Sequence, residues 1–161
     1  MTTLLLLLIV TLGTTPLLPA PSASVPTELQ QHDRANHAMG FDQDKTTHHF
    51  LIEGEGGTIE VTAKDAADRT SIDQIRGHLQ HIAVLFAKGD FSVPMLVHDQ
   101  TPPGAKEMNA HRDAMTFKFE PVSSGGKVVI RTMDARARAA LHEFLRFQIR
   151  EHRTGDPLEP R

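Results

Sequence analysis

The sequence has no cysteine, no tryptophan and no tyrosine among its 161 residues. The lack of cysteine excludes disulfides, thiolate metal sites, iron–sulfur clusters and a cysteine-linked lipid anchor. Without tyrosine and tryptophan the usual aromatic platforms for sugars or single-stranded nucleic acids are missing, although eight phenylalanines remain. The formal net charge of −3 also argues against a nucleic-acid partner, because nucleic-acid binding needs a basic surface.

Residues 1–24 are expected to be a signal peptide. Residues 4–10 form a solid apolar run, LLLLLIV, which is too short to span a bilayer. Small residues at 22–24 offer cleavage sites, and three prolines between positions 16 and 21 oppose the alternative of a buried helix. The first three residues lack the lysine or arginine of an ordinary signal peptide. We therefore expect export to the periplasm or the extracellular space, with no membrane anchor in the mature chain.

The sequence predicts a helix from about Ser71 to Lys88. Five apolar residues recur at the spacing that places them on one stripe of a helix: Ile72, Ile75, Leu79, Ile82 and Phe86. Ser71 with Gln74 fits a capping box, and Gly89 can end the helix in the left-handed conformation. A second helix is expected over residues 136–152, with His152 on the same side as Leu141 and Leu145.

Alternating apolar residues predict a β-hairpin before each helix. The first covers residues 48–53 and 58–63, and the second covers 115–120 and 127–132. Each contains a Gly-Gly pair, which suggests an internal hairpin–helix repeat. Between the two units, residues 95–97 are expected to form a short buried strand, followed by a rigid turn at Thr101-Pro102-Pro103-Gly104.

These elements predict an α+β fold, a two-layer sandwich. Two hairpins form one antiparallel sheet, and both helices cover the same face. The other face would be open or would pair with a second subunit in a homodimer. We assign residues 25–36 to a flexible lead-in, 37–156 to a single domain and 157–161 to a frayed tail.

Ten histidines without a cysteine are the compositional oddity of the chain. In an exported protein that lacks thiolates, a copper or zinc site would have to use histidine, methionine and carboxylates. The repeat aligns His48, His78 and His81 with phenylalanines in the second half, so these three histidines are expected to face inward. Inward imidazoles must find partners or bind something. The predicted metal ligands are therefore His48, His78 and His81, supplemented by His98, His49 and Met39.

A second interpretation makes the protein a structural or interaction module whose histidines are satisfied internally. His48 and His49 are neighbours on a strand and point to opposite faces, so both can hardly serve one site. His32, His111 and His152 are expected to be solvated. The sequence has no H-E-x-x-H motif, and an H-x-x-H spacing alone is a weak signal. The metal-binding interpretation favours a carrier or sensor of copper or zinc.

An enzyme is a third and less favoured class. The chain contains no G-x-S-x-G, P-loop or G-x-G-x-x-G motif. His98 and Asp99 are adjacent in sequence, which usually prevents the contact between a catalytic base and the residue that orients it.

Four stretches carry a resemblance to a known group of proteins: MGFDQDKTTHHF, QIRGHLQHIA, PMLVHDQTPPG and HEFLRFQIREHRTGD. Over residues 37–158 the chain resembles small exported bacterial proteins of no established function, some of them labelled aspartate carbamoyltransferase. The residues do not support that activity, because the carbamoyl-phosphate loop Ser-Thr-Arg-Thr is absent and the chain is about half the length of the enzyme's two-domain fold. The resemblance implies export and a bacterial source, and it supplies no mechanism.

Overall fold

The computed structural model describes Asn36 and residues 39–161. The expected signal peptide and almost all of the expected lead-in lie outside the described residues. The first described element is the 3₁₀ turn η1 (Gln43–Lys45). It leads directly into the first strand of the sheet.

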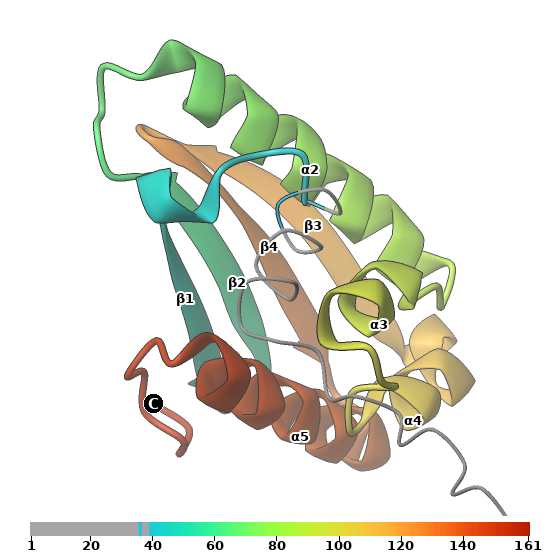
Figure 1. The fold of residues 1–161 in the computed structure, drawn as a ribbon. Coiled ribbons are helices and arrows are strands. Elements are labelled where there is room, and N and C mark those ends of the chain that lie inside the picture. Colours follow the sequence, from blue (N-terminus) through green and yellow to red (C-terminus); the bar gives the residue numbers. More distant parts are fainter. Residues whose placement is uncertain (1–35, 37–38) are drawn as a thin grey trace, which may run out of the picture.

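The fold is α+β, as the sequence predicts. A four-stranded antiparallel sheet has the order β1-β2-β4-β3, with the strands β1 (Thr46–Glu53), β2 (Gly56–Ala63), β3 (Met115–Val122) and β4 (Gly125–Thr132). The two long helices, α2 (Arg69–Ala87) and α5 (Ala135–His152), lie on the same face of this sheet (Figure 1). Among the described residues, no helix is long and apolar enough to cross a membrane.

The turns of the two hairpins differ from the predicted ones. In each hairpin the Gly-Gly pair opens the second strand rather than forming the turn itself. A Cβ atom at Gly56 would lie 2.0 Å from the carbonyl oxygen of Ile130, and one at Gly125 would lie 2.1 Å from that of Val61. Because β2 and β4 are neighbours at the centre of the sheet, only glycine allows their backbones to approach so closely.

Helix α2 also begins differently from the prediction. Its N-cap is Asp68, whose carboxylate accepts a hydrogen bond from the backbone N–H of Ser71 at 3.1 Å. Ser71 is buried in the first turn and donates its hydroxyl to the same carboxylate. Gly89 follows the helix with φ +77°, so the predicted left-handed end is confirmed.

The two hairpin–helix units are interlocked. Helix α2 packs mainly on β3 and β4, whereas α5 packs mainly on β1 and β2. Arg76 of α2 donates hydrogen bonds to the carbonyl oxygens of Val122 and Gly125 at the turn of the second hairpin. His142 of α5 donates to the carbonyl oxygens of Glu53 and Gly56 at the first. Each helix therefore fastens one hairpin turn, an arrangement typical of a structural repeat.

The connection between the units is helical, which corrects one prediction. The residues expected to form a short buried strand lie in α3 (Ser92–His98), where Met95 and Leu96 are exposed and Val97 is buried. The Pro-Pro-Gly turn then leads into α4 (Ala105–Ala110) and a 3₁₀ turn, η2 (Arg112–Ala114). Two neighbouring prolines, Pro102 and Pro103, and Gly104 with φ +79° separate the two short helices.

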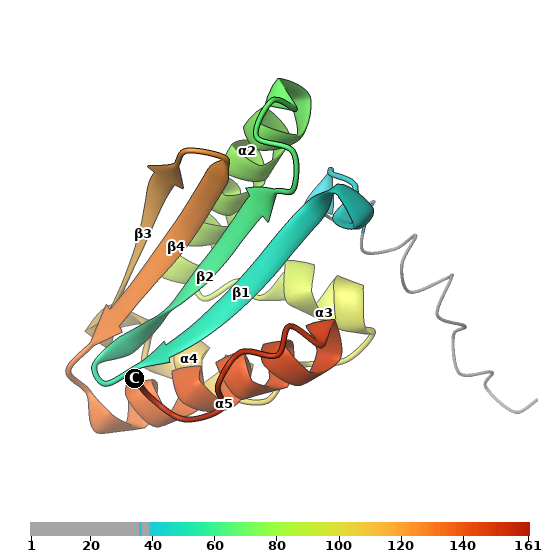
Figure 2. The ribbon, with the colours of Figure 1, turned by 90° about the vertical axis from the view of Figure 1, so that its left-hand side faces the viewer.

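The outer face of the sheet is polar, and no helix of the described chain covers it (Figure 2). Glu120 on this face pairs with Lys118 at 3.0 Å and with Lys127 at 3.5 Å. Arg131 pairs with Glu53 across the same face. The apolar core lies on the opposite face, between the sheet and the helices.

Candidate functional site

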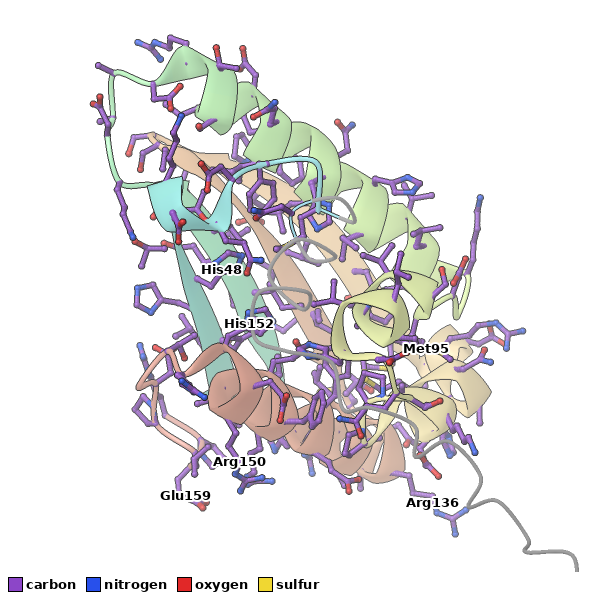
Figure 3. All side chains as sticks on the ribbon, viewed as in Figure 1. His48, Met95, Arg136, Arg150, His152 and Glu159 are labelled. Carbon is purple, nitrogen blue, oxygen red and sulfur yellow. The ribbon has the colours of Figure 1, made fainter. Side chains whose placement is uncertain are left out.

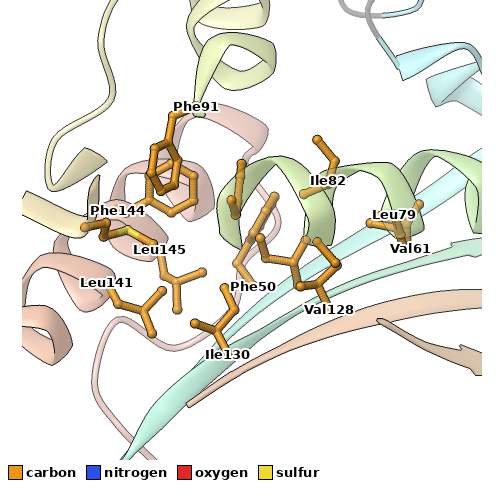
Figure 4. Close-up of a cluster of buried hydrophobic side chains, with 14 of the residues drawn as sticks. Phe50, Val61, Leu79, Ile82, Phe91, Val128, Ile130, Leu141, Phe144 and Leu145 are labelled. Atoms are coloured by element: carbon orange, nitrogen blue, oxygen red, sulfur yellow. The ribbon is translucent and has the colours of Figure 1, made fainter. Parts of the chain in front are cut away.

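A cavity of about 70 Å³ lies between the sheet and the helices α2, α3 and α5. Its floor is formed by β1 and β2, and α3 and the segment before β1 contribute its remaining walls. Most of the lining is apolar, including Phe50, Val61, Leu79, Ile82 and Phe144 (Figure 4). The lining also contains four histidines, a glutamine and a methionine sulfur: His48, His78, His98, His152, Gln148 and Met39. We call this space the histidine cavity.

The four histidines come from four different elements. His48 lies on the inward face of β1, and His78 lies on the flank of the apolar stripe of α2. His98 and His152 are the last residues of α3 and α5, respectively. His48 and His152 approach the same space from the sheet and from the helix layer (Figure 3). The ends of two helices and the middle of a strand thus place imidazoles in one cavity.

Three of the imidazole rings form a row in space, in which His152 lies between His48 and His98. The ring centres of His48 and His152 are 5.4 Å apart and nearly parallel, with an angle of 18° between the planes. Those of His152 and His98 are 5.2 Å apart and nearly perpendicular. His78 is separated from this group by Phe41, whose ring centre lies 5.4 Å from that of His78 and 5.9 Å from that of His48.

Burial keeps these imidazoles neutral. Desolvation, with a smaller contribution from His49, lowers the pKa of His48 to about 4. Desolvation also lowers the pKa of His78 to about 4 and that of His152 to about 3, and neighbouring histidines reinforce both shifts. The pKa of His98 is lowered by burial too, against smaller opposing effects of Gln148 and Glu151. Each ring therefore has an unprotonated nitrogen at neutral pH.

Three polar side-chain atoms at this site are buried without a hydrogen-bond partner: His48 Nε2, His98 Nδ1 and Gln148 Nε2. The side chain of His98 is only 2 % exposed. Its Nε2 atom lies 3.0 Å from Gln148 Oε1, which can only accept, so the Nε2 atom carries the proton. The Nδ1 atom of His98 then keeps a free lone pair. Unpartnered buried nitrogens are destabilising unless a ligand satisfies them.

Among the described residues, no anionic side chain lines the cavity. The carboxylate of Glu151 lies 3.9 Å from His98 Nδ1 and is 35 % exposed. As the side chains of the described residues stand, no group of three or more histidines and carboxylates is arranged to hold a metal ion. The described part of the lining also contains no serine, threonine or lysine that could act as a nucleophile.

The structure brings together four of the six predicted ligands. His48, His78, His98 and Met39 line the histidine cavity. His81 does not, because it is one turn beyond His78 on α2 and rotated into solvent. His49 points to the other face of the sheet, as strand geometry requires.

His152 corrects the sequence-based expectation, which made it a solvated residue. It lines the cavity and contacts the rings of His48, Phe50 and His98. The signal for this position was the apolar stripe of α5, on which His152 follows Leu145 and Ile149 at helical spacing. The tail after the helix could not be predicted from this periodicity. His32 lies outside the described residues, and His111 is partly exposed beside Asp134.

The tail beyond α5 is bound to β1 rather than frayed. The carboxylate of Asp156 accepts hydrogen bonds from the backbone N–H of Phe50 at 3.0 Å and from His49 Nδ1 at 2.9 Å. Farther on, the backbone N–H of Arg161 donates to the carbonyl oxygen of Ile52. Asp156 lies shortly after His152 in the chain, and its partners His49 and Phe50 directly follow His48 on β1. These contacts therefore hold the end of α5 against β1 at the cavity.

Replacing Asp156 by alanine is expected to destabilise the protein by roughly 1–3 kcal/mol, because three donors lose a charged acceptor. Burial alone would raise the pKa of Asp156, but hydrogen bonds from Thr154, Phe50 and His49 outweigh it and lower the pKa. Chemical denaturation of the purified variant measures the loss. Glu159→Ala is the matched control in the same tail, since its pair with Arg146 is exposed and 3.7 Å long. Equal stabilities of the two variants would contradict the role of Asp156.

Comparison of the chain with protein-family models, with curated proteins and with solved structures found no match. The resemblance to small exported bacterial proteins, and the export that it implies, therefore remain predictions. The case for a function rests on the histidine cavity.

Proposed function

We propose that the protein binds a transition-metal ion, copper or zinc, in the histidine cavity and acts as a carrier or sensor of that metal. The observation that carries the proposal is the pair of unpartnered, buried imidazole nitrogens, His48 Nε2 and His98 Nδ1, on either side of His152. A buried nitrogen lone pair without a donor is a site that a cation can satisfy. Low pKa values support this role, because metal binding requires deprotonated imidazoles.

The spacing of the rings also supports a metal. Two imidazoles that bind one tetrahedral ion at about 2 Å have ring centres roughly 5 Å apart. The His48–His152 and His152–His98 distances are 5.4 and 5.2 Å. The planes are not yet directed at one point, so binding requires rotation of the side chains about χ1 and χ2. These rings border a cavity of about 70 Å³, which leaves space beside them.

The hydrogen-bond partner of His98 is of the kind that supports a metal-ligating histidine. A ligating histidine usually donates its second N–H to a carboxylate or carbonyl oxygen, which fixes the tautomer and the direction of the ring. Gln148 Oε1 takes this place for His98. The arrangement favours holding an ion over catalysis, because the lining offers no second reactive group beside the imidazoles and Gln148.

Titration of the purified protein with copper and with zinc by calorimetry tests the proposal. We expect one ion per chain with a dissociation constant below about 100 μM, which corresponds to roughly −5.5 kcal/mol. A His48→Phe/His152→Leu double variant should bind at least about tenfold more weakly, a loss of roughly 1.4 kcal/mol or more.

The matched control is a His81→Ala/His111→Ala double variant, which removes two histidines outside the cavity. It should bind like the wild type. The proposal fails if both double variants bind alike, or if the wild type binds no better than about 100 μM. The histidines would then be structural, and the interpretation as an interaction module would take first place.

A further inference from the structure

We infer that the histidine cavity selects monovalent copper, Cu(I), over Cu(II) and Zn(II). This inference rests on the proposed function and specifies its ligand. It derives from three properties of the cavity: the pairs of neighbouring imidazoles, the charge of its walls and the methionine in its lining.

The first property is the number of donors. Zn(II) is almost always bound by four ligands in structural sites, and Cu(II) prefers a square arrangement of nitrogen and oxygen donors. The described residues contain no group of three or more histidines and carboxylates placed to hold a metal. They do contain successive pairs of imidazoles, His48 with His152 and His152 with His98. Cu(I) is stable with two or three ligands, so one pair and one further donor complete its coordination.

The second property is charge. Most of the described lining is apolar and none of it is a carboxylate; the carboxylate of Glu151, outside the lining, lies 3.9 Å from His98 Nδ1. The cost of removing an ion from water rises with the square of its charge, so a divalent ion costs about four times as much as a monovalent one. Neutral imidazoles do not compensate a second positive charge. A site of this kind therefore favours the ion with the lower charge.

The third property is the thioether of Met39. This side chain is 8 % exposed and lines the same cavity as His48 and His78. Thioether sulfur is a soft donor that selects Cu(I), whereas zinc prefers thiolate, imidazole and carboxylate. Met39 precedes β1 and lines the same cavity as these imidazoles, so we assign its sulfur as the third donor to a pair of imidazoles.

Anaerobic titrations of the purified protein in competition with a coloured Cu(I) chelator test the inference, beside titrations with Ag(I), Cu(II) and Zn(II). Ag(I) serves as a monovalent probe that does not change oxidation state. We expect Cu(I) and Ag(I) to bind at least about 100-fold more tightly than Zn(II). Met39→Leu, which keeps the volume, should weaken Cu(I) and Ag(I) by about tenfold and leave Zn(II) unchanged.

The outcomes separate this inference from the proposed function. Zn(II) or Cu(II) binding as tight as Cu(I), lost in the His48→Phe/His152→Leu variant, overturns the selectivity and leaves the metal site in place. Equal weakening of Cu(I) and Zn(II) by Met39→Leu overturns the role of the sulfur. No binding of any of the four ions overturns both the inference and the proposed function.

Discussion

Lowering the pH from 6.5 to 4 is expected to remove several kcal/mol of stability from the metal-free protein. Four histidines contribute to this effect: His48 and His78, with pKa lowered to about 4, His152, with pKa lowered to about 3, and His98, whose pKa is also lowered by burial. In the unfolded chain each returns to its ordinary pKa of 6.5. The unfolded state therefore binds protons that the folded state cannot.

The direction of the effect follows from this difference. Above pH 6.5 these imidazoles are neutral in both states, and stability does not depend on them. Below pH 6.5 the unfolded chain gains protons and stability falls, until the folded pKa values are reached near pH 4 and below. At pH 5 each histidine with a folded pKa of about 4 accounts for a loss of roughly 2 kcal/mol. Together these histidines remove several kcal/mol, a large part of the stability of a small domain.

Denaturation at a series of pH values, followed by circular dichroism because the chain has no tryptophan or tyrosine, measures this loss. The His48→Phe variant should show a weaker dependence on pH, since it removes one of these histidines. The lowered pKa values of Asp68, Asp90 and Asp134 act below about pH 4, outside this window. A stability that stays constant between pH 6.5 and 4.5 would contradict the burial of neutral histidines.

The second large effect is expected from exchanging the ring-bearing residues at equivalent positions of the two hairpins, His48 and Phe117. His48→Phe should stabilise the metal-free protein by roughly 1–3 kcal/mol at pH 7, because it removes a buried nitrogen without a partner. In a domain of this size that is a rise in melting temperature of about 4 °C or more. The new ring would stack against Phe41 and Phe50, which already flank His48. We therefore expect His48, as a proposed metal ligand, to lower the stability of the metal-free protein.

The reciprocal substitution, Phe117→His, is the matched control. Phe117 occupies the equivalent position in the second hairpin, and its ring packs edge to face against Phe86 at 6.1 Å. The imidazole there should lower stability, since it replaces apolar contacts with a polar ring. Thermal unfolding of both variants gives the comparison. If His48→Phe is destabilised as strongly as Phe117→His, then His48 is a satisfied structural residue.

The repeat explains why much of this site could be predicted from sequence. His48 and His78 align with Phe117 and Phe144, and those phenylalanines pack in the core. Strand alternation placed His48 inward, and helical periodicity placed His78 on the flank of a buried stripe. The alignment with Phe147 failed at His81, because His81 is exposed whereas Phe147 is half-buried and contacts the ring of His98.

Other parts could not be predicted because they depend on tertiary contacts. His152 is the last residue of α5, and helix ends fray unless the residues that follow are held by contacts elsewhere in the fold. Such contacts cannot be seen in the sequence. Here Asp156 binds the backbone of β1 and keeps that end in place. Met95, Leu96 and Val97 look like a buried strand in sequence, since three apolar residues carry no period. They lie instead in a short helix, in which Met95 and Leu96 are exposed and Val97 is buried.

Nitrogen NMR of the imidazoles during a metal titration tests the central claim most directly. With Cu(I) or the diamagnetic probe Ag(I), one equivalent should shift the ring nitrogens of His48, His98 and His152 and lock their tautomers, with His98 binding through Nδ1. The rings of His81 and His111, outside the cavity, should remain unchanged. Shifts confined to the histidines outside the cavity, with no change at His48, His98 and His152, would contradict the account.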